Sequence, residues 1–506
     1  MNGRNIPSNS HSFNSIHFWY KKAIAIAHNK NDHVNHNLTI QHWCNSSVNT
    51  QTEQRECIFT ACTNANYTPV QASIIANRVT NKPQAIAITH SNLEAIQPYT
   101  YLKGAMESGE AIAKAVKSKK RIGVLTRNCI GGSSSNAMMQ HALCGILHYP
   151  ADLLFILIDS EMQADAGISQ AVIDQILALP KEERPEVIIT AGCGCRDESN
   201  MMQLAENGIT IIITDHKPVA YSGILHSAIS IVNPWQYGCQ YADKSISGAT
   251  VAWLVMWAAY DYAYSRSWTN KHNLTALWDY VALGTIADEV SLASTTNRLI
   301  VKHGLRLIAS GVKPCWLALK AAQPKPWLDI DESTLSQLNA GVGARAPYLA
   351  VDFLMSPNLP RATSYWTEIT RSNGMRQAFK QTAPIINSDG DITKLGKLSL
   401  DLYREISQLK PFGSGFAAPV FTAGFKILHV ATIGHRRKTH LRILVRDDNG
   451  AQYQAIWYNA LQDENSVHPV KPGQYCQLHF ELLEDDSQGG VSLRLGVIGL
   501  AQRKHL

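Results

Sequence analysis

The sequence predicts an α/β protein: a parallel sheet domain, then a helical connection, and a β-barrel toward the carboxyl end. Two patterns predict this class. From about residue 120 to residue 234, short β-branched apolar runs alternate with helical segments, which is typical of a doubly wound parallel sheet. From residue 419 onward, short strands with alternating apolar and polar residues dominate, which indicates a small barrel. The 506 residues suffice for about two to four domains.

Composition excludes several classes of protein. Hydrophobic residues make up 45% of the chain and charged residues 17%, so a large core is expected. The sequence has no apolar run long enough for a transmembrane helix, and its polar start lacks the apolar region of a secretory signal. Ten scattered cysteines favour reduced thiols in a cytoplasmic protein over a disulfide framework. The net charge of +6 is compatible with a polyanionic partner without requiring one.

The first half is expected to open with a polar arm, residues 1–65, that is rich in Asn, His, Ser and Thr. An α/β domain is expected over residues 66–310. Its helices are predicted from apolar residues spaced three or four apart, and its strands from short β-branched runs. The strands are expected at 122–125, 153–158, 187–190 and 209–213, and helices at 102–117, 169–177, 197–206, 247–264, 278–286 and 297–307.

The second half is expected to begin with a helical connector, residues 311–400, with helices at 314–322 and 364–380. After it, residues 401–506 read as five or so strands with polar turns, the pattern of an OB-type barrel. Basic and aromatic residues alternate in this part, which suits single-stranded nucleic acid through backbone attraction and base stacking. A solvated basic loop on an ordinary barrel is the plain alternative. The residues predicted to bind nucleic acid here are Arg436, Arg437, Lys438, Arg442, Trp457 and Tyr458.

The run from Ile209 to Ile213 has the composition of a buried parallel strand, and polar residues follow it directly. Asp215 and His216 would lie at its carboxyl end, where α/β sheets place their ligands. A carboxylate and an imidazole at adjacent positions can coordinate one metal ion. The alternative is a surface turn with a chance Asp-His pair.

Several segments, in the same order along the chain, resemble one family. ITDHKP resembles a DHH motif, in which Asp215 and His216 match and Lys217 stands at the second His. The segments that follow resemble later motifs of the same family: residues 230–234 (SIVNP), 247–252 (SGATVA), 279–292 (DYVALGTIADEVSL, with Asp288) and 409–421 (LKPFGSGFAAPVF). From about residue 92 to the carboxyl end, the chain resembles the RecJ branch of the DHH phosphoesterase superfamily, the single-strand-specific 5′ to 3′ exonucleases. The resemblance implies a DHH-type parallel sheet domain and an OB-like β-barrel.

The chain departs from this family where the family binds metal. The first motif of the family is DxDxDG, and the matching turn here, residues 127–132, reads RNCIGG, without an aspartate. The next acidic position falls in AGCGC, residues 191–195, again without a carboxylate. A GGHxxAAG segment is also missing, so the DHHA1 domain of the family is expected to be largely absent from the connector. Of the metal ligands that the resemblance implies, Asp215, His216 and Asp288 remain.

The matching and missing motifs together leave two possible functions. A two-metal phosphodiesterase needs bridging carboxylates, and three ligands suit one Mn²⁺ or Mg²⁺ ion rather than two. We therefore expect a single-stranded nucleic-acid-binding protein, for DNA rather than RNA, with weak or absent hydrolysis, in other words a pseudo-enzyme. The inactive RecJ relatives of the eukaryotic replicative helicase are a precedent in the superfamily, and protein partners in DNA processing fit this interpretation. The alternative is a divergent, active exonuclease of DNA repair or recombination that uses a reduced metal site.

Two further expectations concern the altered turns. Arg127 places a positive charge where the family holds a cation, and it is predicted either to contact a phosphate of the nucleic acid or to be a solvated turn residue. Cys129, Cys193 and Cys195 with His216 have the ligand types of a zinc site. The preferred interpretation of these cysteines is small buried residues without zinc.

Overall fold

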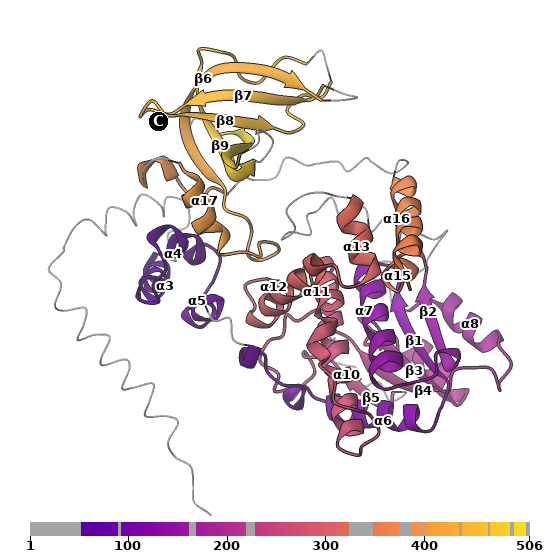
Figure 1. Cartoon of the computed structure of the whole chain (residues 1–506). Helices are drawn as coiled ribbons and strands as arrows, with labels where there is room; N and C mark the ends of the chain where they lie inside the picture. The colour runs from indigo at the N-terminus through magenta and orange to yellow at the C-terminus, as the bar shows by residue number, and fades with distance from the viewer. Residues whose placement is uncertain are drawn as a thin grey trace, which may run out of the picture.

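The computed structural model describes residues 52–89, 93–160, 168–218, 228–322, 338, 348–373, 387–395, 398–434, 438–463, 466–485 and 490–501 (Figure 1). Most of the predicted arm, residues 1–51, lies outside this part, and so do Arg436 and Arg437. In the described residues, no helix is both long and apolar enough to cross a membrane.

Five parallel strands form the sheet of the first half, in the order β2-β1-β3-β4-β5. Helices cover both of its faces, so its central strands are apolar throughout instead of alternating. The order reverses at β1, which pairs with β2 on one side and β3 on the other. Such a reversal opens a crevice beyond the carboxyl ends of the strands. The strands are β1 (Ile122–Arg127), β2 (Leu154–Asp159), β3 (Val187–Ala191), β4 (Thr210–Thr214) and β5 (Ser230–Val232).

The helices that pack on the sheet divide between its two faces. On one face lie α6 (Ala105–Lys117), α7 (Ile130–Gln140) and the apolar α10 (Gly248–Tyr264), and on the other lie α8 (Gln170–Ala178) and α9 (Glu198–Glu206). Alternate residues of a strand therefore enter different cores. Ile212 is buried with α10, whereas Ile211 and Ile213 are buried with α8 and α9.

A helical region follows the sheet: α11 (Trp278–Ala287), α12 (Thr295–Ser310), α13 (Pro314–Ala322), α15 (Leu349–Leu354) and α16 (Leu359–Asn373). The last of these begins five residues before the predicted helix at 364–380, and residues 374–386 lie outside the described part. Single-turn elements connect the larger ones: η1 (Leu93–Ala95), η2 (Tyr99–Tyr101), the π-helical η3 (His141–Ile146), η4 (Ala151–Leu153), η5 (Leu274–Leu277) and η6 (Ile392–Leu395).

Before α6, the described residues form three further helices: α3 (Thr52–Asn64), α4 (Pro69–Ala76) and α5 (Lys82–Thr89). The expectation of a loose polar arm is therefore wrong for residues 52–64. Ile58 and Cys62 are four residues apart on α3 and are each 1% exposed, and the helix packs on α4. Two apolar residues on one face suffice here because a neighbouring helix covers them.

The carboxyl-terminal part is a closed barrel of five strands, preceded by α17 (Leu400–Ser407). Its strands run in the order β10-β8-β7-β6-β9, and inward residues alternate with outward ones. The architecture of parallel sheet, helical region and barrel is thus confirmed (Figure 1). The strands are β6 (Phe421–Ile433), β7 (His440–Arg446), β8 (Gln452–Trp457), β9 (Tyr475–Asp485) and β10 (Ser492–Leu500).

The barrel and the residues that lead into it from Asp389 onward, here called the barrel segment, are held against the helices by buried charge. Arg298 of α12 is 5% exposed; it donates to the carbonyls of Leu409 and Pro411, and its guanidinium carbon lies 4.4 Å from the centre of the Phe416 ring. Burial lowers the pKa of Arg298 to about 10. Figure 1 shows α4 beside α17.

A second link joins the same segment to the amino-terminal helices. Arg78, just after α4, pairs with Asp389 at 2.7 Å, and both side chains are buried. The barrel segment therefore contacts both the amino-terminal helices and α12.

Candidate functional site

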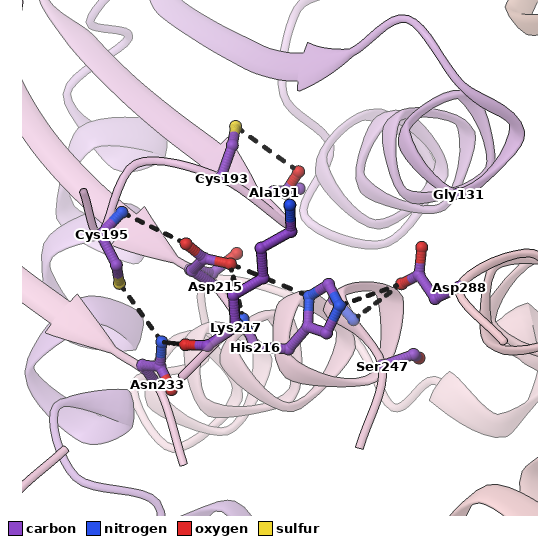
Figure 2. A network of polar contacts seen from close by, with 12 residues as sticks. Gly131, Ala191, Cys193, Cys195, Asp215, His216, Lys217, Asn233, Ser247 and Asp288 are labelled. Carbon is purple, nitrogen blue, oxygen red and sulfur yellow. Dashed lines mark hydrogen bonds and ion pairs between the residues drawn. The ribbon is translucent and has the colours of Figure 1, made fainter. Parts of the chain in front are cut away.

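The predicted metal ligands converge at the carboxyl edge of the sheet, next to the point where the strand order reverses. Asp215 and His216 follow β4, and Asp288 is the residue at the carboxyl end of α11. The His216 ring lies between the two carboxylates: its Nδ1 is 3.8 Å from Asp215 Oδ1, and its Nε2 is 3.8 Å from Asp288 Oδ2 (Figure 2). The structure thus brings all three side chains together.

Backbone N–H groups hold the Asp215 carboxylate. Its Oδ1 accepts from the N–H of His216 at 2.7 Å and of Lys217 at 3.3 Å, and its Oδ2 accepts from the N–H of Cys195 at 3.2 Å. The side chain is 4% exposed. Three N–H donors compensate a buried carboxylate without a metal ion.

The Asp288 carboxylate lies at the amino end of α10, where its Oδ2 accepts from the N–H of Gly248 at 3.1 Å (Figure 2). Ser247 caps the same helix and bonds to Thr285 of α11 at 2.8 Å. The amino end of a helix carries partial positive charge, so α10 stabilises the ionised carboxylate.

Close packing leaves little space between these groups. By the resemblance, Gly131 stands at the third aspartate of the altered turn, and a Cβ there would overlap Asp288 Oδ1. A Cβ on Gly248 would lie 2.9 Å from both the Cα of Gly192 and Nδ1 of His216. Glycines at these positions allow the helices and the strand ends to approach one another.

Two cationic side chains belong to the same region. Arg127 ends β1, and Lys217 follows His216. In Figure 2 the Lys217 side chain extends past Asp215 in the direction of Ala191, at the end of β3. Burial lowers the pKa of the Arg127 guanidinium, but the charges of Cys129 and of both carboxylates are among those that raise it, and the net shift is upward.

Burial raises the pKa of the three cysteines near the site, Cys129, Cys193 and Cys195, and nearby carboxylates raise it further in each case. Zinc binds the thiolate form, so this environment opposes zinc coordination. The nine cysteines of the described part are all free thiols.

Two buried carboxylates nearby did not figure in the sequence prediction. Asp159 ends β2 and accepts from the N–H and the hydroxyl of Ser169, both at 2.7 Å. Asp197 precedes α9, and burial raises its pKa. The rule that ligands gather at strand ends would have selected Asp159 from the sequence, because it follows an apolar run.

A two-ion metal site does not fit these residues. Within the described residues, no group of three His, Cys, Asp or Glu side chains is arranged to hold an ion. His216 Nδ1 is buried and has no hydrogen-bond partner among the described residues, and a Cβ on Gly248 would lie 2.9 Å from it. Both oxygens of Asp215 already accept N–H bonds, so an ion bound there would share the carboxylate with these donors.

We expect Gly131→Ala to destabilise the chain by about 1–3 kcal/mol, because the new methyl group displaces the Asp288 carboxylate. Chemical denaturation followed by tryptophan fluorescence measures the loss. Gly145→Ala is the matched control, since a Cβ there meets nothing within 4 Å. Equal stability of the two variants would show that Asp288 is not held against α7.

The barrel presents a second candidate site on β7 and β8, the strands that correspond to the nucleic-acid-binding face of OB folds. Arg442 is exposed on β7, and Lys438 is exposed in the connection from β6 to β7. That connection is the first binding loop of an OB fold, and it also contains the predicted residues Arg436 and Arg437.

The two predicted stacking residues differ in exposure. Tyr458 follows β8 and is 57% exposed, and its ring lies 5.6 Å from that of His440. Trp457 pairs in register with the buried Leu441 and packs partly buried against the barrel core. Of the two rings, that of Tyr458 is the more available for stacking on a base.

Comparisons with known proteins identify both parts of the chain. The model "DHH family, N-terminal domain" matches residues 47–285, and "RecJ OB domain" matches residues 389–498. The single-stranded-DNA-specific exonuclease RecJ of Salmonella typhimurium is 26% identical over 344 residues, 65% of this chain and 57% of the relative. That of Escherichia coli is 25% identical over 348 residues, with the same two shares. The chain thus spans 57% of the length of these relatives.

Solved structures agree in fold. RecJ from Thermus thermophilus in complex with Mn²⁺ has a TM-score of 0.64 at 17% identity, over 90% of this chain and 78% of that one. The complex of the same protein with Mg²⁺ has a TM-score of 0.57 at 16% identity, over 89% of this chain and 77% of that one. Residues 47–285 thus match the DHH family and residues 389–498 match the RecJ OB domain, and the chain resembles RecJ in sequence and in fold.

Proposed function

We propose that this protein binds single-stranded DNA through its barrel and hydrolyses it weakly or not at all. The observation that carries the proposal is the combination of an OB face bearing exposed Lys438, Arg442 and Tyr458 with a strand-end cluster whose carboxylates are bonded to N–H groups. DNA is proposed over RNA because the relatives are named for single-stranded DNA.

Binding of single-stranded DNA and weak hydrolysis are proposed for different physical reasons. Cationic side chains on a nucleic-acid-binding face attract the phosphates, and an exposed ring stacks on a base whatever the sequence. Hydrolysis requires ions that neutralise the phosphate and generate hydroxide, and the altered turn at residues 127–132 contributes no carboxylate to hold a second one. Phosphate contact by Arg127 remains a prediction.

A divergent, active exonuclease is the second candidate. His216 Nε2 and Asp288 Oδ2, 3.8 Å apart, are the observation that favours it, because a single Mn²⁺ or Mg²⁺ ion could lie between them. Such an ion would take its third ligand from Asp215, whose oxygens also accept the N–H bonds.

We expect fluorescence anisotropy with a labelled oligothymidine to show salt-sensitive binding. With about four cationic contacts, the logarithm of the association constant should fall against that of salt with a slope of about −3. Arg442→Ala should reduce this slope by about 0.7, because one phosphate contact is lost. Tyr458→Ala should weaken binding about tenfold or more without changing the slope, because stacking releases no counterions.

Lys471→Ala is the matched control. Lys471 is exposed in the loop before β9, which bonds to Ile427 in the middle of β6 and lies outside β7 and β8, and its replacement should leave the slope unchanged. Binding that is absent at low salt, or that Lys471→Ala weakens as much as Arg442→Ala does, would contradict the assignment of the β7–β8 face.

A further inference from the structure

We infer that the strand-end cluster is a metal-independent charge cluster, in which Arg127, Lys217 and the amino end of α10 take the electrostatic place of divalent ions. Two-metal phosphodiesterases concentrate carboxylates and balance them with cations. Here fewer carboxylates remain, and the chain itself supplies positive charge. The inference concerns how the cluster is held together, and it does not depend on nucleic-acid binding.

The substitutions at the cluster change charge in one direction. By the resemblance, Arg127 stands at the first aspartate of the altered turn, and Lys217 stands at the second His of the DHH motif. The first exchange replaces a negative charge with a positive one, and the second adds a positive charge. Both make the site less attractive to a cation and more attractive to the remaining carboxylates.

The geometry shows where the compensation acts. Asp215 accepts three backbone N–H bonds, and Asp288 accepts one from the first residue of α10. Both carboxylates are nearly buried, with 4% and 8% of their side chains exposed, so the charge of Arg127 acts on them with little screening by water. Against the lowering effect of burial, Cys129 and then Asp288 and Asp215 raise the pKa of Arg127, so the two carboxylates account for part of its upward shift.

The segments around the cluster pack closely against one another. The backbone of α7 at Gly131 lies against Asp288, and Gly192 and Gly248 bring the ends of β3 and α10 together. An aspartate at Gly131 would overlap Asp288 Oδ1. The third aspartate of the family motif and the present position of Asp288 are therefore mutually exclusive.

The first test uses the unmodified full chain and the metal alone. After dialysis against EDTA, adding millimolar Mn²⁺ should change the melting temperature by less than about 1 °C, because an ion without a ligand set does not stabilise the folded state. A saturable rise in melting temperature that Asp288→Asn abolishes would overturn the inference.

The second test is a double-mutant cycle. Arg127→Met should lower the melting temperature by about 5–10 °C, since it leaves buried carboxylates uncompensated. The double variant, Arg127→Met with Asp288→Asn, should lose about 3 °C less in melting temperature than the two single variants lose together. Arg184→Met is the control, because Arg184 bonds to backbone carbonyls and Asn207 instead of a carboxylate, and its loss should add to that of Asp288→Asn.

The Arg127→Lys variant tests whether the charge of Arg127, rather than the shape of its side chain, stabilises the protein. It keeps the positive charge, so it should retain more than half of the stability that Arg127→Met loses. Additive losses in the Arg127 cycle, or a Lys variant as unstable as the Met variant, would overturn the inference. Neither thermal test involves DNA, so a failure here is distinguishable from a failure of the proposed function, which anisotropy measures.

Discussion

Incubated with a labelled single strand of DNA and Mn²⁺ or Mg²⁺, the chain should release product at least about 10³-fold more slowly than RecJ of Escherichia coli. The physical reason is the missing second ion. Without it, the phosphate charge is neutralised poorly and hydroxide is not generated beside the scissile bond.

The controls for this experiment are Asp215→Ala and Asp288→Ala. Any residual rate should be the same in both variants as in the parent chain, because trace contamination would supply it. Strong 5′ to 3′ degradation that both substitutions abolish would contradict the weak-hydrolysis proposal and favour the exonuclease. A binding measurement on the same preparations shows that the strand still reaches the protein.

Replacing Arg298 with alanine should destabilise the protein by about 3 kcal/mol. The change leaves two buried carbonyls, those of Leu409 and Pro411, without their donor and removes the cation from the Phe416 ring. Urea denaturation followed by tryptophan fluorescence measures the loss, and limited proteolysis reports whether the barrel segment has loosened.

Arg306→Ala is the matched control for this prediction. It lies on the same helix, α12, but is exposed, so its replacement should change the stability by less than about 0.5 kcal/mol. If the two variants unfold at the same urea concentration, the buried guanidinium does not attach the barrel to the helices.

The parallel sheet could be predicted because its signal is local. Runs such as Ile211–Ile213 are apolar on both faces, which only a strand covered by helices on both sides explains. The helix α3 could not be predicted in this way, because its apolar face consists of little more than Ile58 and Cys62. Its stability depends on α4, and tertiary contacts of this kind are invisible to a periodicity argument.

The residues of the candidate site could be predicted from the sequence, but the groups that their carboxylates contact could not. The strand-end rule selected Asp215 and His216, and the family resemblance added Asp288. Whether those carboxylates face a metal ion or N–H groups depends on close approaches such as that of Gly131 to Asp288, between segments far apart in the sequence. Trp457 illustrates the same limit in the barrel, since only the strand register shows that it lies opposite the buried Leu441.

Because the barrel segment is attached at two points, it should stay bound to the rest of the molecule even when the chain is cut. Arg78 of the amino-terminal helices and Arg298 of α12 both bind this segment, on the far side of the connector from their own positions in the chain. A protease that cut the chain between α16 and Asp389 would therefore produce two polypeptides that stay bound to each other. The connector supplies covalent continuity, while the two arginines keep the halves together.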